Sequence, residues 1–276
     1  TNVGCAATQG RFHREDVYMP ITPMFHVHAW GFPYVATLLG VKQVYPGKYL
    51  PGTLLQLLRD EKVTFSHCVP SILQMLFAHP DFASTDLSKW KVLIGGSAMS
   101  QALASAAMKK GIDALTGYGM SETCPVLTIA HLTQADLEDS FDAQATIRCK
   151  TGRPLPLVDV HNVTPEITDV QHNDQATGEV VVRSPWLTQG YLDAPQASEN
   201  LWAGGYLHTQ DIGHIDARGY LKITDRIKDV IKTAGEWTSS LQLEDVVAAH
   251  EAVQDVAVIG LPDEKWGERP LALVVL

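Results

Sequence analysis

Lys91-Val-Leu-Ile-Gly-Gly-Ser97 and Ile112-Asp-Ala-Leu-Thr-Gly-Tyr-Gly119 are the two stretches that decide the fold class of this chain. Each is a short apolar run that ends in glycines, and a helical pattern over about 100–110 separates them. Strand, glycine turn, helix and strand in this order predict a mainly parallel sheet flanked by helices. Ligands of such sheets bind beyond the carboxyl ends of the strands, so both glycine turns are candidate binding positions.

The segments on either side first extend this pattern and then change it. Residues 63–69 are predicted as another strand, and Pro70 as the first residue of a helix that runs through Phe77. Beyond residue 151 the pattern becomes that of β-hairpins, with strands expected at 178–184, 206–216 and 219–224. A strand, a helix and further strands follow from residue 229.

We therefore expect an α/β fold in three parts. A parallel-sheet subdomain with flanking helices covers residues 1–150, and a β-rich subdomain covers 151–226. The start of a small C-terminal α/β domain covers 227–276.

The composition excludes several classes of protein. The 276 residues are 45% hydrophobic, which is too apolar for a disordered chain. Because the net charge is −10, we do not expect a protein that binds nucleic acid through a basic face. The four cysteines form no CxxC pair, so we expect neither a disulfide framework nor a thiolate zinc site, and we expect a cytoplasmic protein.

One uncharged stretch, residues 17–41, is long enough to cross a bilayer. It contains three prolines, Pro20, Pro23 and Pro33, which would leave backbone groups unsatisfied in lipid. We predict a buried segment of a soluble protein and no transmembrane segment.

The sequence does not match two common catalytic patterns, a serine nucleophile elbow and a histidine metal site. A serine nucleophile elbow needs G-x-S-x-G, but Gly95-Gly-Ser-Ala-Met99 and Gly119-Met-Ser-Glu-Thr123 lack the last glycine. On a strand, His26 and His28 would share one face, as two metal ligands could. No third ligand stands at a suitable spacing, which favours a polar pair in a pocket wall or in the core.

Thr116-Gly-Tyr-Gly-Met-Ser-Glu-Thr123 offers several groups to a nucleotide. Its glycines allow a flat or charged ligand to approach the backbone closely, and the Tyr118 ring offers a face on which such a ligand could stack. Ser121 could donate to a phosphate, and Glu122 offers a hard oxygen to Mg²⁺. The alternative interpretation is an ordinary glycine turn.

Two further groups of polar residues occur in the second half of the chain. Asp211 stands at an expected strand end, where a carboxylate could hold a ribose diol. Arg226, Lys228 and Lys232 are spaced so that an extended chain would present all three on one face. The alternative for these cations is a solvated, charged strand.

Four passages in this order resemble the AMP-forming adenylate synthetase superfamily of acyl-CoA synthetases, luciferases and adenylation domains. They are Pro23-Met-Phe-His-Val-His-Ala-Trp30, Gly117-Tyr-Gly-Met-Ser-Glu122, Tyr206-Leu-His-Thr-Gln-Asp211 and Asp225-Arg-Ile-Lys-Asp-Val-Ile-Lys-Thr-Ala-Gly-Glu-Trp-Thr-Ser-Ser240. The chain is most similar to medium- and long-chain fatty-acyl-CoA synthetases, chiefly through Gly235-Glu-Trp-Thr-Ser-Ser240. The resemblance covers nearly the whole chain, with residues 1–150 as part of the large N-terminal AMP-binding domain.

The resemblance implies a role for each matching residue. It implies an adenine pocket walled by Gly96, Ser97, Gly117, Tyr118 and Gly119. It implies that Ser121 contacts the α-phosphate, that Glu122 binds Mg²⁺ and that Asp211 binds the ribose hydroxyls. The nucleotide would also be faced by Arg226, Lys228 and Lys232, and the acyl channel bordered by His26 and Trp30. Gly235 and Trp237 would lie near the nucleotide or the path of coenzyme A.

The implied activity is that of a fatty-acid:CoA ligase. A fatty acid would react with MgATP to give acyl-AMP and pyrophosphate, and coenzyme A would then take the acyl group. Catalysis would rest on Glu122, Arg226 and Lys228, and Lys228 matches the hinge of the family's mobile C-terminal domain. The resemblance implies fatty acid, ATP and CoA as partners, with AMP as a product, and allows a homodimer.

The chain departs from the family pattern at its ends and at single positions. The family's phosphate loop would precede residue 1 and its C-terminal catalytic lysine would follow Leu276, so we expect an internal fragment that is inactive alone. Gln210, Ala234 and Ser121 replace the commoner Gly, Gly and Thr. The alternatives are a non-catalytic adenylate-binding fragment and an aryl-CoA ligase or luciferase-like relative.

Overall fold

The computed structural model describes residues 11–233, 236–248, 250 and 252–276. The chain divides into two compact units. The first unit comprises Thr1–Asp159, Ser184–Tyr191 and Gly219–Leu221. The second comprises Val160–Arg183, Leu192–Arg218 and Lys222–Leu276. The three-part division at residues 150 and 226 stays a prediction.

The first unit is built on a seven-stranded sheet in the order β2-β1-β3-β4-β5-β6-β7. Strands β2, β1, β3, β4 and β5 pair in parallel, and β6 and β7 are antiparallel. The bounds are β1 Val17–Pro20, β2 Lys42–Gln43, β3 Phe65–Cys68, β4 Lys91–Ile94, β5 Asp113–Gly119, β6 Val126–Ile129 and β7 Arg153–Pro154. The predicted mainly parallel sheet is therefore confirmed.

Helices and short 3₁₀ turns connect these strands. They are α2 Val27–Trp30, α3 Phe32–Leu39, α4 Pro51–Asp60, α5 Pro70–Phe77, η1 Pro80–Phe82, α6 Gln101–Lys109, η2 Ser121–Thr123, α7 Gln134–Glu138 and α8 Phe141–Cys149. Helix α5 begins and ends at the predicted residues. Helix α6 begins after Ser100, whose hydroxyl accepts a hydrogen bond from the Leu103 amide and so caps the helix.

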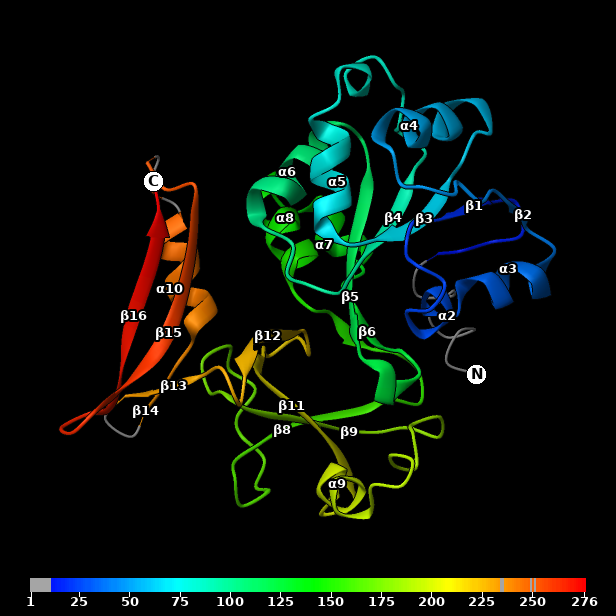
Figure 1. Ribbon diagram of the computed structural model, residues 1–276. Helices are drawn as coiled ribbons and strands as arrows, with labels where there is room; N and C mark the ends of the chain where they lie inside the picture. The colour runs from blue at the N-terminus through cyan, green and yellow to red at the C-terminus, as the bar shows by residue number, and fades with distance from the viewer. Residues whose placement is uncertain (1–10, 234–235, 249, 251) are drawn as a thin grey trace. The chain divides into compact units, whose positions relative to one another are not determined.

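Alternation along β4 divides the core of this unit into two layers. Val92 and Ile94 belong to the cluster that contains the apolar residues of α4, α5 and α6. Leu93 points to the opposite face and belongs with Tyr18 and Phe32 in the cluster beside α3. Figure 1 shows α5, α6 and α8 gathered beside β4 and β5, away from α2 and α3. The sheet is thus covered on both faces, as a parallel sheet requires.

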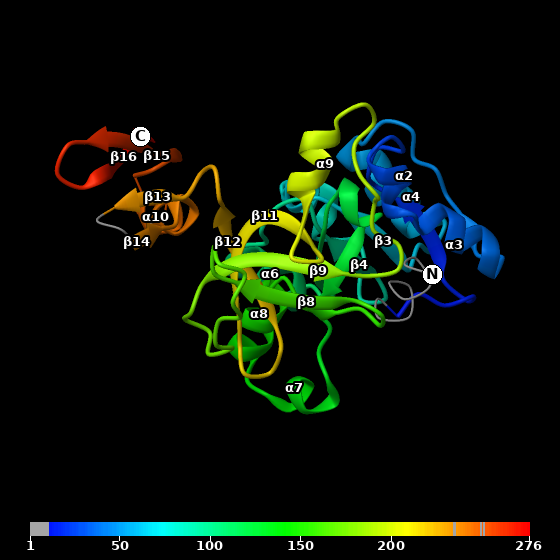
Figure 2. The same ribbon diagram turned by 90° about the horizontal axis from the view of Figure 1, so that it is seen from below.

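The second unit contains two further sheets. The first has the order β10-β11-β9-β8, and β12 also pairs with β11. Figure 2 shows β8, β9 and β11 side by side. Its elements are β8 Asp159–Val163, β9 Gly178–Arg183, α9 Pro195–Leu201, β10 Trp202–Ala203, β11 Tyr206–Ile215 and β12 Leu221–Arg226. The predicted β-rich region is confirmed.

The last sheet has the order β14-β13-β16-β15. Its elements are β13 Ile231–Thr233, β14 Glu236–Thr238, α10 Ser240–Ala248, β15 Asp255–Asp263 and β16 Gly267–Val275. The carboxylate of Asp225 accepts hydrogen bonds from the backbone N–H and the hydroxyl of Ser240, at 2.7 and 3.0 Å. It thereby caps the start of α10 from the end of β12.

The uncharged stretch 17–41 is broken into β1, α2 and α3, so it does not form one continuous helix. None of the helices within the described ranges combines the length and apolarity that a membrane crossing needs.

Candidate active site

The first unit contains a cavity, and one of its walls is made of glycine backbone at the ends of β4 and β5. A Cβ added at Gly119 would lie 1.8 Å from the carbonyl oxygen of Pro125, and one added at Gly117 would lie 3.1 Å from Cδ1 of Leu93. Gly96 adopts φ +82°, a conformation that glycine tolerates best. The chain folds this closely only because these positions have no side chain.

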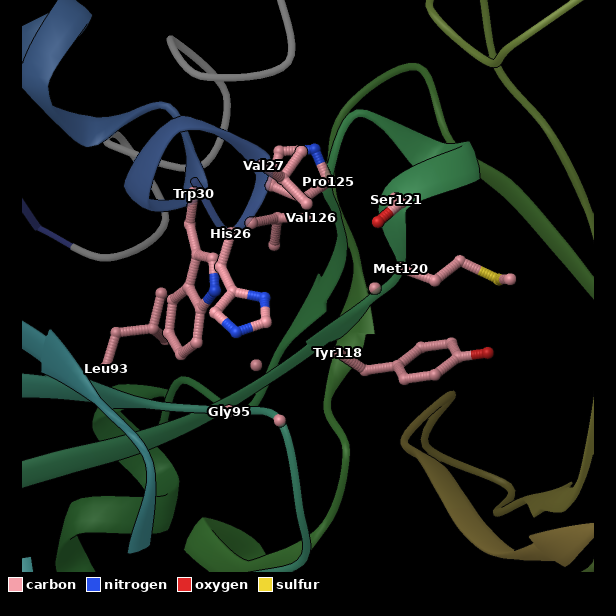
Figure 3. A pocket seen from close by; sticks show the side chains of 13 residues that line it. His26, Val27, Trp30, Leu93, Gly95, Tyr118, Met120, Ser121, Pro125 and Val126 are labelled. Atoms are coloured by element: carbon pink, nitrogen blue, oxygen red, sulfur yellow. The ribbon is translucent and has the colours of Figure 1, made fainter. Parts of the chain in front are cut away.

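The opposite wall comes from α2, which is a turn with left-handed backbone. Val27, His28, Ala29 and Trp30 have φ between 44° and 56°. Four non-glycine residues in this region are costly, at about 1–2 kcal/mol each. Figure 3 shows His26, Val27 and Trp30 on one side of the cavity and Tyr118, Met120 and Ser121 on the other.

Between these walls lies a cavity of about 180 Å³. The residues around it come from α2, the ends of β4 and β5, η2 and the start of β6. They are His26, Val27, Trp30, Leu93, Gly95, Gly96, Gly117, Tyr118, Gly119, Met120, Ser121, Pro125 and Val126. The cavity thus brings together two motifs that are about 90 residues apart in the sequence.

The indole of Trp30 is held between Gly95 and the buried ring of His67. A Cβ on Gly95 would approach Cη2 of Trp30 to 2.9 Å, and the Trp30 and His67 ring centroids are 4.9 Å apart. His67 Nε2 lies 2.7 Å from the Tyr18 hydroxyl, and Nδ1 lies 3.0 Å from the Thr22 hydroxyl. Burial lowers the pKa of His67 to about 3, so the ring is neutral at pH 7.

Glu122 lies in η2, next to the cavity. Its Oε1 accepts a hydrogen bond from the hydroxyl of Tyr191 at 2.8 Å, and its carbonyl oxygen accepts one from the amide of Thr188 at 2.9 Å. Thr123 caps η2 by accepting from the amide of Met120. A carboxylate has about four lone-pair positions, so one hydrogen bond leaves capacity for a cation.

In the second unit, Asp211 follows an irregularity in β11. The pairing of β11 with β9 shifts between His208 and Ile212, and Gln210 adopts φ +61°. This β-bulge places Asp211 in a buried position, only 6% exposed. Its Oδ1 lies 3.3 Å from Nε of Arg226. A positive φ is a conformation that glycine adopts more readily than glutamine.

Comparison with known proteins identifies the family of the chain. The family model described as AMP-binding enzyme matches residues 1–192. The chain belongs to the AMP-binding enzyme family. The model described as AMP-binding enzyme C-terminal domain matches residues 242–276.

Three similar proteins illustrate the range of the AMP-binding enzymes. A long-chain-fatty-acid–CoA ligase of Thermus thermophilus is 40% identical over 95% of this chain and 49% of its own length. A 3-methylmercaptopropionyl-CoA ligase of Ruegeria lacuscaerulensis is 36% identical, over 94% of this chain and 48% of its own length. The structure of an amide bond synthetase from Marinactinospora thermotolerans has a TM-score of 0.85 at 26% identity, covering 99% of this chain and 54% of that chain. The chain spans about half the length of these relatives.

In this AMP-binding enzyme, the structure groups most of the residues predicted for the first unit. Seven of them line the cavity: His26, Trp30, Gly96, Gly117, Tyr118, Gly119 and Ser121. Ser97 follows Gly96 in a bend and is not among the lining residues. Glu122 is next to Ser121 and partly buried. Their individual roles toward a nucleotide stay predictions.

One local expectation is wrong. Arg226, Lys228 and Lys232 do not share one extended face, because β12 ends at Arg226, Lys228 lies in a turn and Lys232 lies in β13. Backbone hydrogen bonds to the Arg226 carbonyl from the amides of Asp229 and Val230 close this turn. Lys228 therefore lies in the turn that joins two sheets.

His26 and His28 do not lie on a strand: His26, with φ −76°, precedes α2, and His28 belongs to the left-handed turn of α2. The described residues contain no group of three or more His, Cys, Asp or Glu side chains suited to a metal. Gly235 lies outside the described residues. Trp237 belongs to β14, where its backbone pairs with Lys232.

Several residues of the site were not predicted. Val27, Leu93, Met120, Pro125 and Val126 line the cavity. They are apolar residues that resemble ordinary core positions in the sequence. Tyr191, which contacts Glu122, has no sequence signal at all, because 69 residues separate the pair.

Proposed function

We propose that the whole protein that contains this chain is an AMP-forming acyl-CoA ligase that acts on a medium- or long-chain fatty acid. The observation that carries this proposal is the cavity between the glycine wall and the turn of His26 and Trp30. A bare backbone wall accommodates a flat ring, and the apolar side chains opposite suit an acyl group. Membership of the AMP-binding enzyme family supports the nucleotide, and the Thermus ligase supports the acyl class.

The proposed reaction has two steps. The fatty-acid carboxylate attacks the α-phosphorus of ATP, an acyl-phosphate bond forms, and the bond to pyrophosphate breaks. The thiol of coenzyme A then attacks the acyl carbon, loses its proton, and AMP leaves. Neither step needs a covalent bond to the enzyme, in keeping with the lack of a nucleophile elbow in the sequence.

The first step brings an anion toward an anion, so it requires positive charge. We propose that Arg226 and Lys228 supply part of it, that Ser121 donates to the α-phosphate and that Asp211 binds the ribose hydroxyls. Asp211 suits this role because it is a buried carboxylate, which accepts hydrogen bonds from hydroxyl groups.

Glu122 fits a magnesium ion, since its carboxylate is partly buried, lies next to the cavity and is held in place by Tyr191. Magnesium takes one or two protein carboxylates together with substrate phosphates. When bound, it would neutralise charge on the phosphates. The role of Glu122 is to hold the ion beside Ser121.

The acid specificity tests the proposal. We expect the whole protein to form AMP with fatty acids of eight or more carbons, with affinity rising by about 0.8 kcal/mol for each buried methylene. Coenzyme A should convert the adenylate to a thioester. AMP formation with aromatic acids or short thioether acids, but not with fatty acids, would overturn the substrate assignment.

Glu122→Gln tests the metal assignment. Loss of the negative charge should lower adenylate formation by about 100-fold. Glu138→Gln is the matched control, because Glu138 is an exposed residue at the end of α7. Equal activity of the two variants would contradict the role of Glu122.

Lys228→Pro tests the hinge role that the family resemblance implies. A fixed φ in the turn between β12 and β13 should slow thioester formation more than adenylate formation. An equal loss in both half-reactions would argue against a hinge.

Pyrophosphate release by the 276-residue chain alone would refute the alternative that it only binds adenylate.

A further inference from the structure

The β-bulge before Asp211 is held by a carboxylate from the neighbouring strand. Glu179 lies in β9, opposite Ile212 of β11, and its side chain is 16% exposed. Its Oε1 accepts a hydrogen bond from the backbone amide of Gln210 at 3.1 Å. Its Oε2 lies 2.9 Å from Nδ1 of His208. The two oxygens of one carboxylate therefore contact both sides of the bulge.

The bulge in turn fixes the residues around it. The Gln210 carbonyl accepts a hydrogen bond from the amide of Ile227 at 2.9 Å, in the turn that contains Lys228. The amide of Asp211 donates to the hydroxyl of Thr209 at 3.2 Å. Gln210 thus uses its amide toward Glu179 and its carbonyl toward the turn.

Without Glu179 as an acceptor for the Gln210 amide, the bulge would lose the side-chain hydrogen bond that holds it. Loss of Glu179 would leave the Gln210 amide to water, and the net loss of this intramolecular hydrogen bond weakens the conformation that it holds. At Gln210 the competing conformation is the regular strand, which has negative φ and avoids the strain of φ +61°. A return to a regular strand shifts the register by one residue, and this shift turns Asp211 to the other face of the sheet.

We propose that Glu179 is a positioning residue, which holds the bulge at Gln210 so that the Asp211 carboxylate faces the ribose of the nucleotide. The inference rests on the proposed function, since it takes the ribose as the ligand of Asp211. Glu179 itself contacts the strand and not the substrate. Its effect is therefore specific to the part of the nucleotide that Asp211 binds.

The test compares ATP with 2′-deoxy-ATP in adenylate formation by the whole protein. The measured quantity is the ratio of kcat/KM for the two nucleotides, which reports binding of the ribose hydroxyl. We expect Asp211→Asn to lower this ratio, and Glu179→Ala to lower it by about fivefold or more, mainly through KM for ATP. Glu179→Gln should keep most of the ratio, because its amide oxygen can still accept from Gln210.

Two further variants complete the design. Glu199→Ala removes an exposed carboxylate from α9 in the same unit, and it should leave the ratio unchanged. Glu179→Asp keeps the charge but shortens the reach by one methylene, so it should lower the ratio even if Glu179→Ala fails to fold. In an Asp211→Asn background, Glu179→Ala should produce no additional change in the ratio.

The outcomes separate the inference from the proposed function. If Asp211→Asn leaves the ratio unchanged, the ribose assignment itself is wrong. If Asp211→Asn lowers the ratio but Glu179→Ala and Glu179→Asp do not, the positioning role is wrong. A Glu179 variant that is less stable but loses activity equally with both nucleotides would show a merely structural residue and would overturn the inference.

Discussion

The hydroxyl of Tyr191 donates a hydrogen bond to Oε1 of Glu122 at 2.8 Å, joining two segments of the chain that are 69 residues apart. Burial and the Glu122 carboxylate raise the pKa of Tyr191 above its ordinary value of 10. The hydroxyl therefore stays protonated at neutral pH and remains a donor. This contact restricts the rotamers of the Glu122 side chain.

Tyr191→Phe should raise the Mg²⁺ concentration needed for half-maximal adenylate formation by about fivefold, the effect of losing about 1 kcal/mol of hydrogen bonding. The measurement is a magnesium titration of adenylate formation. Tyr45→Phe removes a hydroxyl that donates to Gln43 at 2.7 Å on the surface, and it serves as the control. If the two variants give the same magnesium curve as the unchanged protein, Tyr191 does not position Glu122.

Gly119→Ala should destabilise the fold, because Gly119 forms the tightest contact of the glycine wall. The new Cβ would lie 1.8 Å from the carbonyl oxygen of Pro125, and this clash involves backbone that cannot move aside. We expect a loss of about 3 kcal/mol in the free energy of unfolding, measured by urea denaturation of the chain. Gly40→Ala, with φ +68° but open space around the Cβ, should lose only about 1 kcal/mol. Comparable losses would contradict the steric explanation.

The buried ring of His67 should make the fold sensitive to acid. Burial lowers the pKa of His67 from 6.5 to about 3, so between these values the unfolded chain binds a proton that the folded chain does not. Stability then falls as pH falls through this window, by up to about 1.4 kcal/mol per pH unit. His67→Phe should flatten the dependence of unfolding free energy on pH. His172 is exposed, and His172→Phe serves as the control that should leave the slope intact. An unchanged slope in His67→Phe would refute this account.

Gln210→Gly should stabilise the chain by up to about 1 kcal/mol, because glycine adopts a φ of +61° without the strain that a side chain imposes. The Gln210 side chain is exposed, so its removal breaks little packing. Lys222→Gly, at an exposed strand position of β12, is the control and should destabilise by about 0.5–1 kcal/mol. Thermal unfolding compares the two. A destabilised Gln210→Gly variant would mean that the side chain contributes contacts that its exposure does not suggest.

The sequence predicts those elements whose signals are local. Apolar runs bounded by glycine or proline give β4 and α5 with correct bounds, and the hydroxyl of Ser100 marks the start of α6. The sequence also predicts Gly117, Tyr118 and Gly119 as walls of a nucleotide pocket and Ser121 as a phosphate contact, and all four line the cavity. At these positions the residue type itself carries the information, because a missing Cβ or a capping hydroxyl acts within a few residues.

Other features depend on contacts that the sequence does not reveal. The left-handed backbone of Val27 to Trp30 has no local signal in the sequence, because no glycine marks it before Gly31. The turn at Lys228 is closed by backbone hydrogen bonds to Arg226, which a charge pattern cannot show. The bulge at Gln210 depends on Glu179 from another strand.

The two walls of the cavity respond differently to mutation. The glycine wall presents peptide groups, and its tightest contact, between Gly119 and Pro125, excludes every side chain. The turn of His26, Val27 and Trp30 presents side chains, so substitutions there alter the lining of the cavity directly. Under the proposed function, substitutions in the turn would change the acyl-facing side of the cavity, while the glycine wall keeps its shape. Directed evolution of the whole protein toward other acids should accordingly begin by randomising those three positions.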